Sequence, residues 1–246
     1  MYKRFFQLVV LLLASCTNAA SLPKETPTPI PSQEIDPTMR KIHYLALGDS
    51  YTIGESVDEP ERWSNQLADL IETDKGRDVD VKIVARTGWT TDELWQGIQA
   101  DEINPPYDLV SLLIGVNNQY RGRDIEEYRE QFVFLLNKSI EYTGGDVNRV
   151  IVLSIPDWGV TSYAKGKGSD PEQVARETDA FNAVNQKETE NAGARYIDIT
   201  HISREAIKDP SLIAGDGLHP SGKMYAMWAE KTLPVALKIL SVGKGE

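Results

Sequence analysis

The sequence is poor in the residues that build metal centres and disulfide scaffolds. Its 246 residues include one cysteine, Cys16, and only three histidines. A single cysteine cannot form an intramolecular disulfide or a cysteine-based zinc site, and no His-Glu-x-x-His pair is present. We therefore expect a domain that folds on a hydrophobic core and works without a metal.

Clustered positive charge is also lacking. Lys and Arg number 26 against 37 Asp and Glu, so the net charge is −11. Proteins that bind phosphate backbones carry clusters of Lys and Arg, which excludes nucleic acid as an expected partner. A Walker loop and a Gly-x-Gly-x-x-Gly turn are absent as well, so no nucleotide cofactor is expected.

No apolar run is long enough to span a bilayer, which takes about 20 residues. The run from Phe5 to Ala14 follows Lys3 and Arg4, and this order is typical of an export signal. It ends in Leu13-Ala14-Ser15-Cys16, which resembles the bacterial lipoprotein signal. The resemblance implies that residues 1–15 are a signal peptide and that Cys16 is lipidated. The alternative is a free thiol at the end of an ordinary signal peptide.

The segment after Cys16 is rich in proline. Its prolines stand among Ser, Thr and Glu at Pro23, Pro27, Pro29, Pro31 and Pro37. Such dense proline favours extended backbone, so residues 16–38 are interpreted as the lipidated cysteine and a tether. The folded domain is expected over residues 39–246. A lipid anchor would place it in the bacterial cell envelope, attached to a membrane and outside the cytoplasm.

The pattern from Met39 onward predicts strands that alternate with helices. The short apolar runs expected to be strands are Ile42–Leu47, Val81–Ala85, Leu109–Ile114, Val150–Ile155 and Tyr196–Ile199. The expected helices are Arg62–Thr73, Asp92–Asp101, Ile125–Tyr142, Pro171–Asn191 and Pro220–Ile239, the last kinked or ended by Pro234. Continuous apolar runs suit strands buried on both faces. This order predicts an α/β fold, a three-layer α/β/α sandwich with a mostly parallel five-stranded sheet.

Ligands of open parallel sheets bind beyond the carboxyl ends of the strands. The segments that follow the first three predicted strands contain Ser50, Gly88 and Asn117, and Asp216-Gly217-Leu218-His219 precedes the last helix. We expect these segments to converge at one edge of the sheet.

Together they could supply a catalytic triad. A serine hydroxyl needs a base, His219 can be that base, and a carboxylate such as Asp216 can orient the imidazole. Ser50 could instead be a helix-capping serine, and His219 a structural residue near a helix N-terminus. Asp198 is the second candidate for the carboxylate.

The tetrahedral intermediate of acyl transfer also needs donors for its oxyanion. The candidates are the backbone N–H groups of Ser50 and Gly88 and the side-chain amide of Asn117. Residues Thr90 to Glu93 read as a capping box, which would put Gly88 near a helix N-terminus that favours negative charge.

Four segments in this order resemble those of the GDSL-type, or SGNH, hydrolases, which are named for their Ser, Gly, Asn and His. They are Gly48-Asp49-Ser50-Tyr51, Gly88, Gly115-Val116-Asn117-Asn118 and Asp216-Gly217-Leu218-His219-Pro220. The resemblance covers roughly residues 41 to 237 and implies esterase, lipase or acyl-transfer chemistry without a metal or cofactor. Tyr51 stands where the family name has leucine, and Asn118 stands where an aspartate is usual. The second departure puts the geometry of that loop in doubt.

Other residues have weaker signals. Asp49 is expected to brace the loop beside Ser50, while His43 and His201 have no motif around them. Trp89 and Trp158 could line a pocket for an acyl group or a sugar, or could merely pack their loops.

The segment from Tyr163 to Ser169 reads as a mobile surface loop, and whether it gates the site stays open. The first hypothesis is a serine esterase that acts on a small acyl ester through an acyl-enzyme. The alternative is a non-catalytic envelope lipoprotein that binds acylated glycans or lipids. The substrate within the ester class stays open.

Overall fold

The structure is a computed structural model that describes residues 40–241. The predicted signal peptide, the predicted lipidation at Cys16 and the proline-rich tether lie outside the described residues. Within residues 40–241, no helix is both long and apolar enough to cross a membrane.

The centre of the domain is a parallel sheet. Its strands are β1 (Ile42–Gly48), β2 (Val79–Ala85), β3 (Leu109–Leu113), β4 (Val150–Leu153) and β5 (Arg195–Ile197). They lie in the order β2-β1-β3-β4-β5, and every neighbouring pair is parallel. The strand that follows β1 in the sequence, β2, lies on one side of β1, and β3, β4 and β5 lie on the other side. The order of strands therefore reverses between β1 and β3, and sheets of this kind bind ligands at such a switch point.

The burial of the strands follows their place in the sheet. Every residue of β3 and β4 is buried, and so is every residue of β1 except His43. The edge strands differ: β2 carries Asp80 and Lys82, and β5 has only three residues. Short or charged edges discourage pairing with another chain, so the apolar runs are concentrated where both faces are covered.

Helices cover both faces of the sheet. They are α1 (Ser50–Ile53), α2 (Trp63–Lys75), α3 (Thr91–Ala100), α4 (Val116–Tyr120), α5 (Ile125–Tyr142), α6 (Ser162–Lys167), α7 (Pro171–Ala192), α8 (Thr200–Arg204) and α9 (Gly222–Ser241). Short 3-10 turns lie at Glu59–Glu61, Val147–Arg149, Trp158–Val160, Glu205–Ile207 and Pro210–Leu212.

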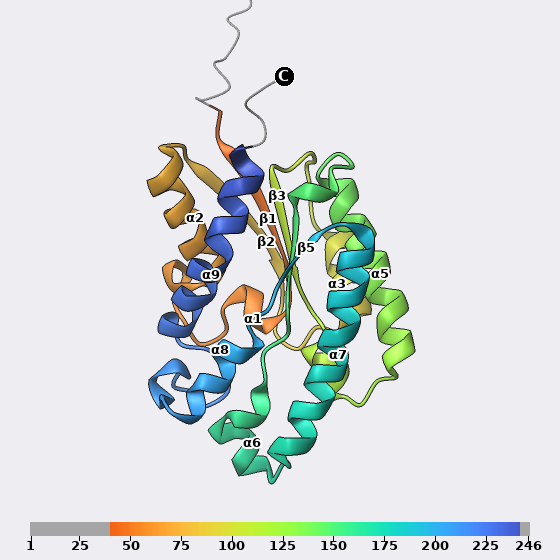
Figure 1. Ribbon diagram of the computed structural model, residues 1–246, viewed down its shortest axis with the longest axis vertical. Helices are drawn as coiled ribbons and strands as arrows, with labels where there is room; N and C mark the ends of the chain where they lie inside the picture. Colours follow the sequence, from red (N-terminus) through yellow and green to blue (C-terminus); the bar gives the residue numbers. More distant parts are fainter. Residues whose placement is uncertain (1–39, 242–246) are drawn as a thin grey trace, which may run out of the picture. The chain divides into compact units, whose positions relative to one another are not determined.

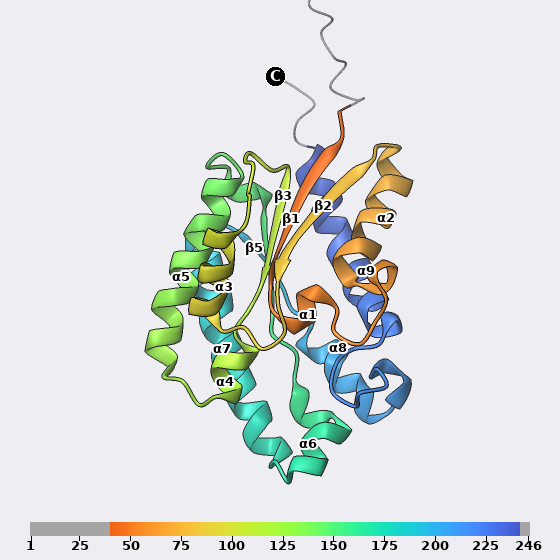
Figure 2. The ribbon, with the colours of Figure 1, turned by 180° about the vertical axis from the view of Figure 1, so that it is seen from behind.

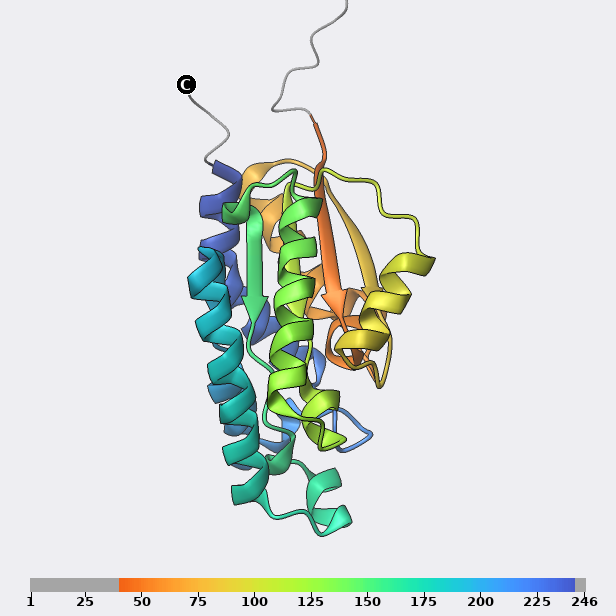
Figure 3. The same cartoon turned by 90° about the vertical axis from the view of Figure 1, so that its right-hand side faces the viewer.

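Helices α2 and α9 lie on one face, and α3, α5 and α7 lie on the other (Figure 1 and, from behind, Figure 2). In Figure 3 the second group stands in front of the sheet and α9 behind it. The predicted three-layer α/β/α sandwich is confirmed.

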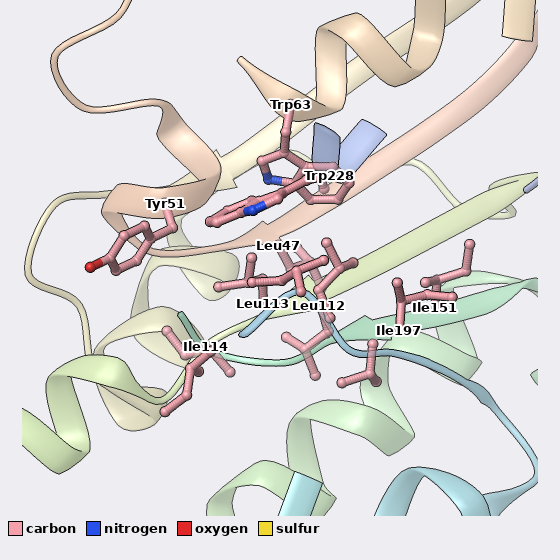
Figure 4. Close-up of a cluster of buried hydrophobic side chains, with 14 of the residues drawn as sticks. Leu47, Tyr51, Trp63, Leu112, Leu113, Ile114, Ile151, Ile197 and Trp228 are labelled. Carbon is pink, nitrogen blue, oxygen red and sulfur yellow. The ribbon is translucent and has the colours of Figure 1, made fainter. Parts of the chain in front are cut away.

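Large aromatic side chains fill the layer between the sheet and helices α2 and α9. Trp63 of α2 and Trp228 of α9 are both fully buried, and Figure 4 shows them side by side above Leu47 of β1. Leu67 and Ile71 follow Trp63 at helical spacing and are also fully buried. Each such side chain stabilises the fold by about 1.5–3 kcal/mol, so this layer holds α2 and α9 against the sheet.

Two local predictions are corrected. The segment from Tyr163 to Ser169 is mostly helix α6, because the Thr161 side chain caps its first turn and Gly168 ends it in the left-handed conformation. Helix α9 starts at Gly222 rather than Pro220 and continues through Pro234 to Ser241. A proline inside a helix removes one backbone donor, and α9, which packs on α2, continues past it.

Candidate active site

Ser50 lies in a tight turn from strand β1 into helix α1. It is the first residue of α1, its exposed fraction is 4%, and the Asp49 carboxylate caps the helix by accepting from the Tyr51 N–H at 3.0 Å. Gly48 makes this turn possible: a Cβ there would lie 2.5 Å from the Leu113 carbonyl oxygen of β3. The nucleophile candidate is therefore fixed by close backbone packing and by the Asp49 cap.

Asp216 and His219 form a compact turn before α9. The Asp216 Oδ1 atom accepts from the backbone N–H groups of Leu218 at 2.9 Å and His219 at 3.0 Å. Its Oδ2 atom lies 2.5 Å from His219 Nδ1. Gly217 has a left-handed φ of 75°, and a Cβ there would lie 2.5 Å from Ser162 Oγ. Glycine is thus required for this turn to hold both side chains together.

The carboxylate of Asp216 stays ionised well into acid. Partial burial raises its pKa, but hydrogen bonds from His219, from the Leu218 backbone and from Ser56 outweigh burial and bring the pKa to about 2. An anionic Asp216 fixes the imidazole of His219 with its proton on Nδ1. The Tyr51 ring packs against that imidazole with centroids 5.5 Å apart.

Asp49 has the opposite electrostatic setting. Complete burial raises its pKa to about 7, against the lowering effect of the hydrogen bond from the Tyr51 N–H. Its second oxygen, Oδ2, accepts from no residue in the described range 40–241. The bracing role expected for Asp49 agrees with its contact to Tyr51, and complete burial of the carboxyl group disfavours its charge.

Gly88 lies on the loop between β2 and α3. Its φ of 87° is left-handed, and the capping box of Thr90 and Glu93 expected from the sequence is present at the start of α3. Arg121, at the C-cap of α4, donates to the Gly88 carbonyl oxygen at 2.6 Å and also pairs with Glu93 at 3.0 Å. The orientation of the Gly88 peptide is therefore held from a neighbouring helix.

Asn117 lies on α4, just after β3. Its Nδ2 donates to the Trp89 carbonyl oxygen at 3.0 Å, which leaves the second hydrogen of the amide for another acceptor. The neighbouring Asn118 is fully buried and exchanges hydrogen bonds with Thr91, accepting from its N–H at 3.1 Å and donating to its hydroxyl at 2.8 Å. A neutral amide thus ties α4 to the start of α3 at the position where an aspartate is usual.

The expected site residues converge on one pocket of about 170 Å³. Ser50, Gly88, Asn117 and His219 all line it, and Asp216 contacts His219. The expected convergence at the switch point of the sheet is present. His219, however, is not at the N-cap of α9, which begins three residues later.

Aromatic residues form one wall of the pocket. Tyr120, Trp158 and Tyr163 line it, and the Tyr120 and Tyr163 hydroxyl oxygens lie 3.1 Å apart. The backbone N–H of Tyr163 donates to the Gly217 carbonyl oxygen at 3.0 Å, which docks α6 on the turn that carries His219.

Several candidates lie elsewhere. Asp198 pairs with His201 at 3.3 Å, outside the pocket that Ser50 lines, and His43 pairs with Asp80 at 3.5 Å. Trp89 packs on Gly97, where a Cβ would lie 2.0 Å from its ring. Within residues 40–241, no group of His, Cys, Asp and Glu side chains is arranged to hold a metal ion.

Sequence reasoning missed Ser56, Arg121 and Tyr120. Ser56 donates to Asp216 at 2.8 Å, Arg121 orients Gly88, and Tyr120 completes the aromatic wall. Tyr120 ends the short helix that carries Asn117, and Arg121 caps it, so their closeness to Asn117 in the sequence was a usable signal. Nothing in the sequence around Ser56 indicates its contact with a residue 160 positions away.

A parallel sheet covered by helices on both faces, with a pocket at its switch point, is typical of the doubly wound α/β proteins that bind ligands at the carboxyl ends of their strands. The chain belongs to the GDSL-like lipase/acylhydrolase family, whose model matches residues 46–227. The match places it among hydrolases that act on ester bonds. A curated relative, an acetylxylan esterase of Geobacillus stearothermophilus, is 26% identical over 142 residues, 55% of this chain. The matched part spans 62% of the length of that relative.

Solved structures share the fold at low identity. A lipase/acylhydrolase from Enterococcus faecalis is 17% identical with a TM-score of 0.62, covering 82% of this chain and 96% of its own. The psychrotrophic esterase EstA from Pseudoalteromonas sp. is 17% identical with a TM-score of 0.61, covering 81% of this chain and 98% of its own. At such identities the likeness shows the fold alone.

Proposed function

We propose that this protein is a serine esterase with Ser50, His219 and Asp216 as its triad. The observation that carries the proposal is the position of the His219 imidazole. Asp216 holds Nδ1 at 2.5 Å while the ring lines the same pocket as Ser50. The Nε2 atom is then the free basic nitrogen that a serine nucleophile requires.

In the proposed reaction, Ser50 Oγ attacks the ester carbonyl carbon while His219 Nε2 takes the hydroxyl proton. The tetrahedral intermediate collapses, the bond to the alcohol oxygen breaks, and His219 returns the proton to the leaving alcohol. Water then attacks the acyl-enzyme with His219 again as base, which releases the acid and restores the Ser50 hydroxyl.

The proposed oxyanion donors are the backbone N–H groups of Ser50 and Gly88 and the second amide hydrogen of Asn117. Two features support them. Gly88 is held by Arg121 through its carbonyl oxygen, and Asn117 is held by Trp89 through one hydrogen, so both donors are oriented before substrate arrives. Pre-oriented donors stabilise the transition state without reorganising during the reaction.

The pocket size supports a short acyl group. Its volume of about 170 Å³ lies below the roughly 300–1,000 Å³ of pockets that hold drug-sized ligands. The wall of Tyr120, Trp158 and Tyr163 is apolar with polar edges, which suits an acyl methyl group or the ring face of a sugar. The esterase relative acts on acetylxylan by its name, and an acetylated sugar is a substrate to test here.

Replacement of Ser50 by alanine tests the proposal. We expect the Ser50→Ala variant to lose nearly all hydrolysis of p-nitrophenyl acetate, on the order of 10⁶-fold in kcat, as triad losses do elsewhere. Ser211→Ala is a matched control, because Ser211 is an exposed serine hydrogen-bonded to Asp209, away from the pocket. If the Ser50→Ala variant hydrolysed the ester as fast as the Ser211→Ala control, the proposed mechanism would be refuted.

The binding lipoprotein is the alternative from another class. A binder would tolerate loss of the Ser50 hydroxyl and would hydrolyse no ester, while binding acetylated sugars with unchanged affinity. The intact His219–Asp216 pair beside Ser50 favours the enzyme, since a binder has no use for an oriented base.

We also propose that the domain is lipid-anchored through Cys16 in the cell envelope. The support for this proposal is the sequence Leu13-Ala14-Ser15-Cys16 at the end of an apolar run, which resembles the bacterial lipoprotein signal. Cys16→Ser should abolish labelling by a fatty-acid analogue; persistent labelling would refute the anchor.

A further inference from the structure

The backbone of Ser56 is unusual. Its φ of 68° lies in the left-handed region, and Ser56 is the one non-glycine residue with such a φ in the range 40–241. A side chain in this conformation brings Cβ too close to the backbone, so glycine is the residue that adopts it without cost. Non-glycine residues held in this way cluster at functional sites, where the surrounding structure maintains them.

The hydroxyl of Ser56 contacts the proposed triad. It donates to Asp216 Oδ2 at 2.8 Å, and the same oxygen lies 2.5 Å from His219 Nδ1. The other oxygen, Oδ1, accepts only from backbone N–H groups of the turn that Asp216 itself begins. Among the described residues, Ser56 is therefore the single donor to Asp216 from outside that turn.

The turn that carries Ser56 also touches two other parts of the pocket. The backbone N–H groups of Gly54 and Glu55 donate to the Ser50 carbonyl oxygen at 3.1 and 3.0 Å. The Glu55 carboxylate accepts from the hydroxyl of Thr87, the residue before Gly88. One turn thus connects the nucleophile helix, the Gly88 loop and the carboxylate of the triad.

A purely conformational explanation does not account for serine here. If the chain needed only a left-handed residue, glycine would supply it at lower cost, as Gly54 does two residues earlier. Ser56 is exposed, so burial of its side chain gives no reason for a serine, and the hydroxyl that donates to Asp216 is the part of the side chain that has a function.

We propose that Ser56 is a positioning residue of the active site, whose hydroxyl fixes Asp216 Oδ2 in the plane that aligns His219 with Ser50. This inference rests on the proposed esterase function. The Ser56 hydroxyl touches neither substrate nor the reacting atoms and acts through Asp216. Its loss should lower the rate of the chemical step and leave substrate binding unchanged.

The experiment compares Ser56→Gly with Ser56→Ala in steady-state hydrolysis of p-nitrophenyl acetate. Glycine removes the hydroxyl and relieves the backbone, while alanine removes the hydroxyl and keeps the left-handed Cβ. Misplacing a catalytic group by 1 Å can cost about 100-fold, and the two backbone donors still hold Oδ1, so we expect kcat to fall about tenfold in both variants. KM should stay within about twofold, because no part of the substrate contact changes.

Two further readouts separate positioning from folding. The thermal midpoint of Ser56→Gly should equal or exceed that of the parent, because the strained side chain is gone. The downfield NMR signal of the proton between His219 Nδ1 and Asp216 should shift or broaden in both variants and stay unchanged in the Ser211→Ala control.

A Ser56→Gly variant with parental kcat and an unchanged downfield signal would overturn the inference. So would a loss of activity that appears only in Ser56→Ala, because backbone strain alone would then explain it. Failure of the esterase function is recognised separately: in that case Ser50→Ala and the parent protein would hydrolyse the ester at the same rate.

Discussion

The buried carboxyl group of Asp49 makes stability depend on pH in a direction that is unusual for an aspartate. Burial raises its pKa to about 7, whereas the ordinary pKa of an aspartate is 3.8. Between these values the folded state binds the proton more tightly than the unfolded state. Stability is therefore highest below about pH 4 and falls as the pH rises to 7, after which this contribution is constant.

The magnitude follows from the shift. About three pH units, at 1.36 kcal/mol each, correspond to a loss on the order of 4 kcal/mol across this range. Asp49→Asn replaces the carboxyl group with a neutral amide that can still accept from the Tyr51 N–H and cap α1. Relative to the parent protein, the variant should gain stability as the pH rises from 4 to 7.

Urea denaturation at pH 4, 5.5, 7 and 8 measures this difference. Asp170→Asn is a matched control, because Asp170 also caps a helix with its side chain but is exposed. Subtracting each variant from the parent removes the contribution of all other titrating groups. A difference between Asp49→Asn and parent that stays constant from pH 4 to 8 would refute the reasoning, as would one that changes equally in the control.

Further predictions concern the surroundings of the pocket. Arg121→Met should lower kcat for p-nitrophenyl acetate about tenfold, because the Gly88 carbonyl oxygen loses the hydrogen bond from Arg121 that orients its peptide. A kcat equal to that of the parent would show that the Gly88 loop keeps its orientation without Arg121. Trp158→Ala should shift the preference from acetate toward longer acyl esters by opening the aromatic wall, and an unchanged chain-length profile would contradict that placement. Trp228→Ala should reduce the free energy of unfolding in urea by about 3–5 kcal/mol, since its ring is fully buried; a loss below about 1 kcal/mol would argue against the described packing.

Much of the fold was predictable because its central strands are buried on both faces. Runs such as Leu109–Leu113 and Val150–Leu153 are apolar at every or nearly every position, and only parallel strands covered by helices need that pattern. The predicted strand Val81–Ala85 is two residues shorter than β2, because Val79 and Asp80 do not extend the continuous apolar run. Its extra length depends on pairing with β1, which is a tertiary contact.

Helix α6 was not predicted because nearby residues favour different structures. Gly166 and Gly168 indicate a loop, yet only Gly168 ends the helix, while Thr161 caps its start and Ala164 is buried. The hydrogen bond from the Tyr163 N–H to the Gly217 carbonyl oxygen also stabilises the helix, and this is a tertiary contact. A helix of six residues is too short to show a periodic apolar pattern in its sequence.

The candidate site was predictable where its residues follow strands directly. Ser50 and Asn117 stand at the ends of β1 and β3, and parallel topology brings such positions to one edge. Ser56 could not be found in this way, because its role depends on a left-handed φ and on a turn 160 residues away in sequence. Both are properties of the folded chain.

The most direct test of the account is covalent labelling of the nucleophile. The present chain, incubated with a fluorophosphonate and digested, should carry one phosphonyl group on Ser50 and lose esterase activity in proportion to its labelling. Labelling of another residue, or full esterase activity in a protein completely labelled at Ser50, would contradict the assignment of Ser50 as the nucleophile.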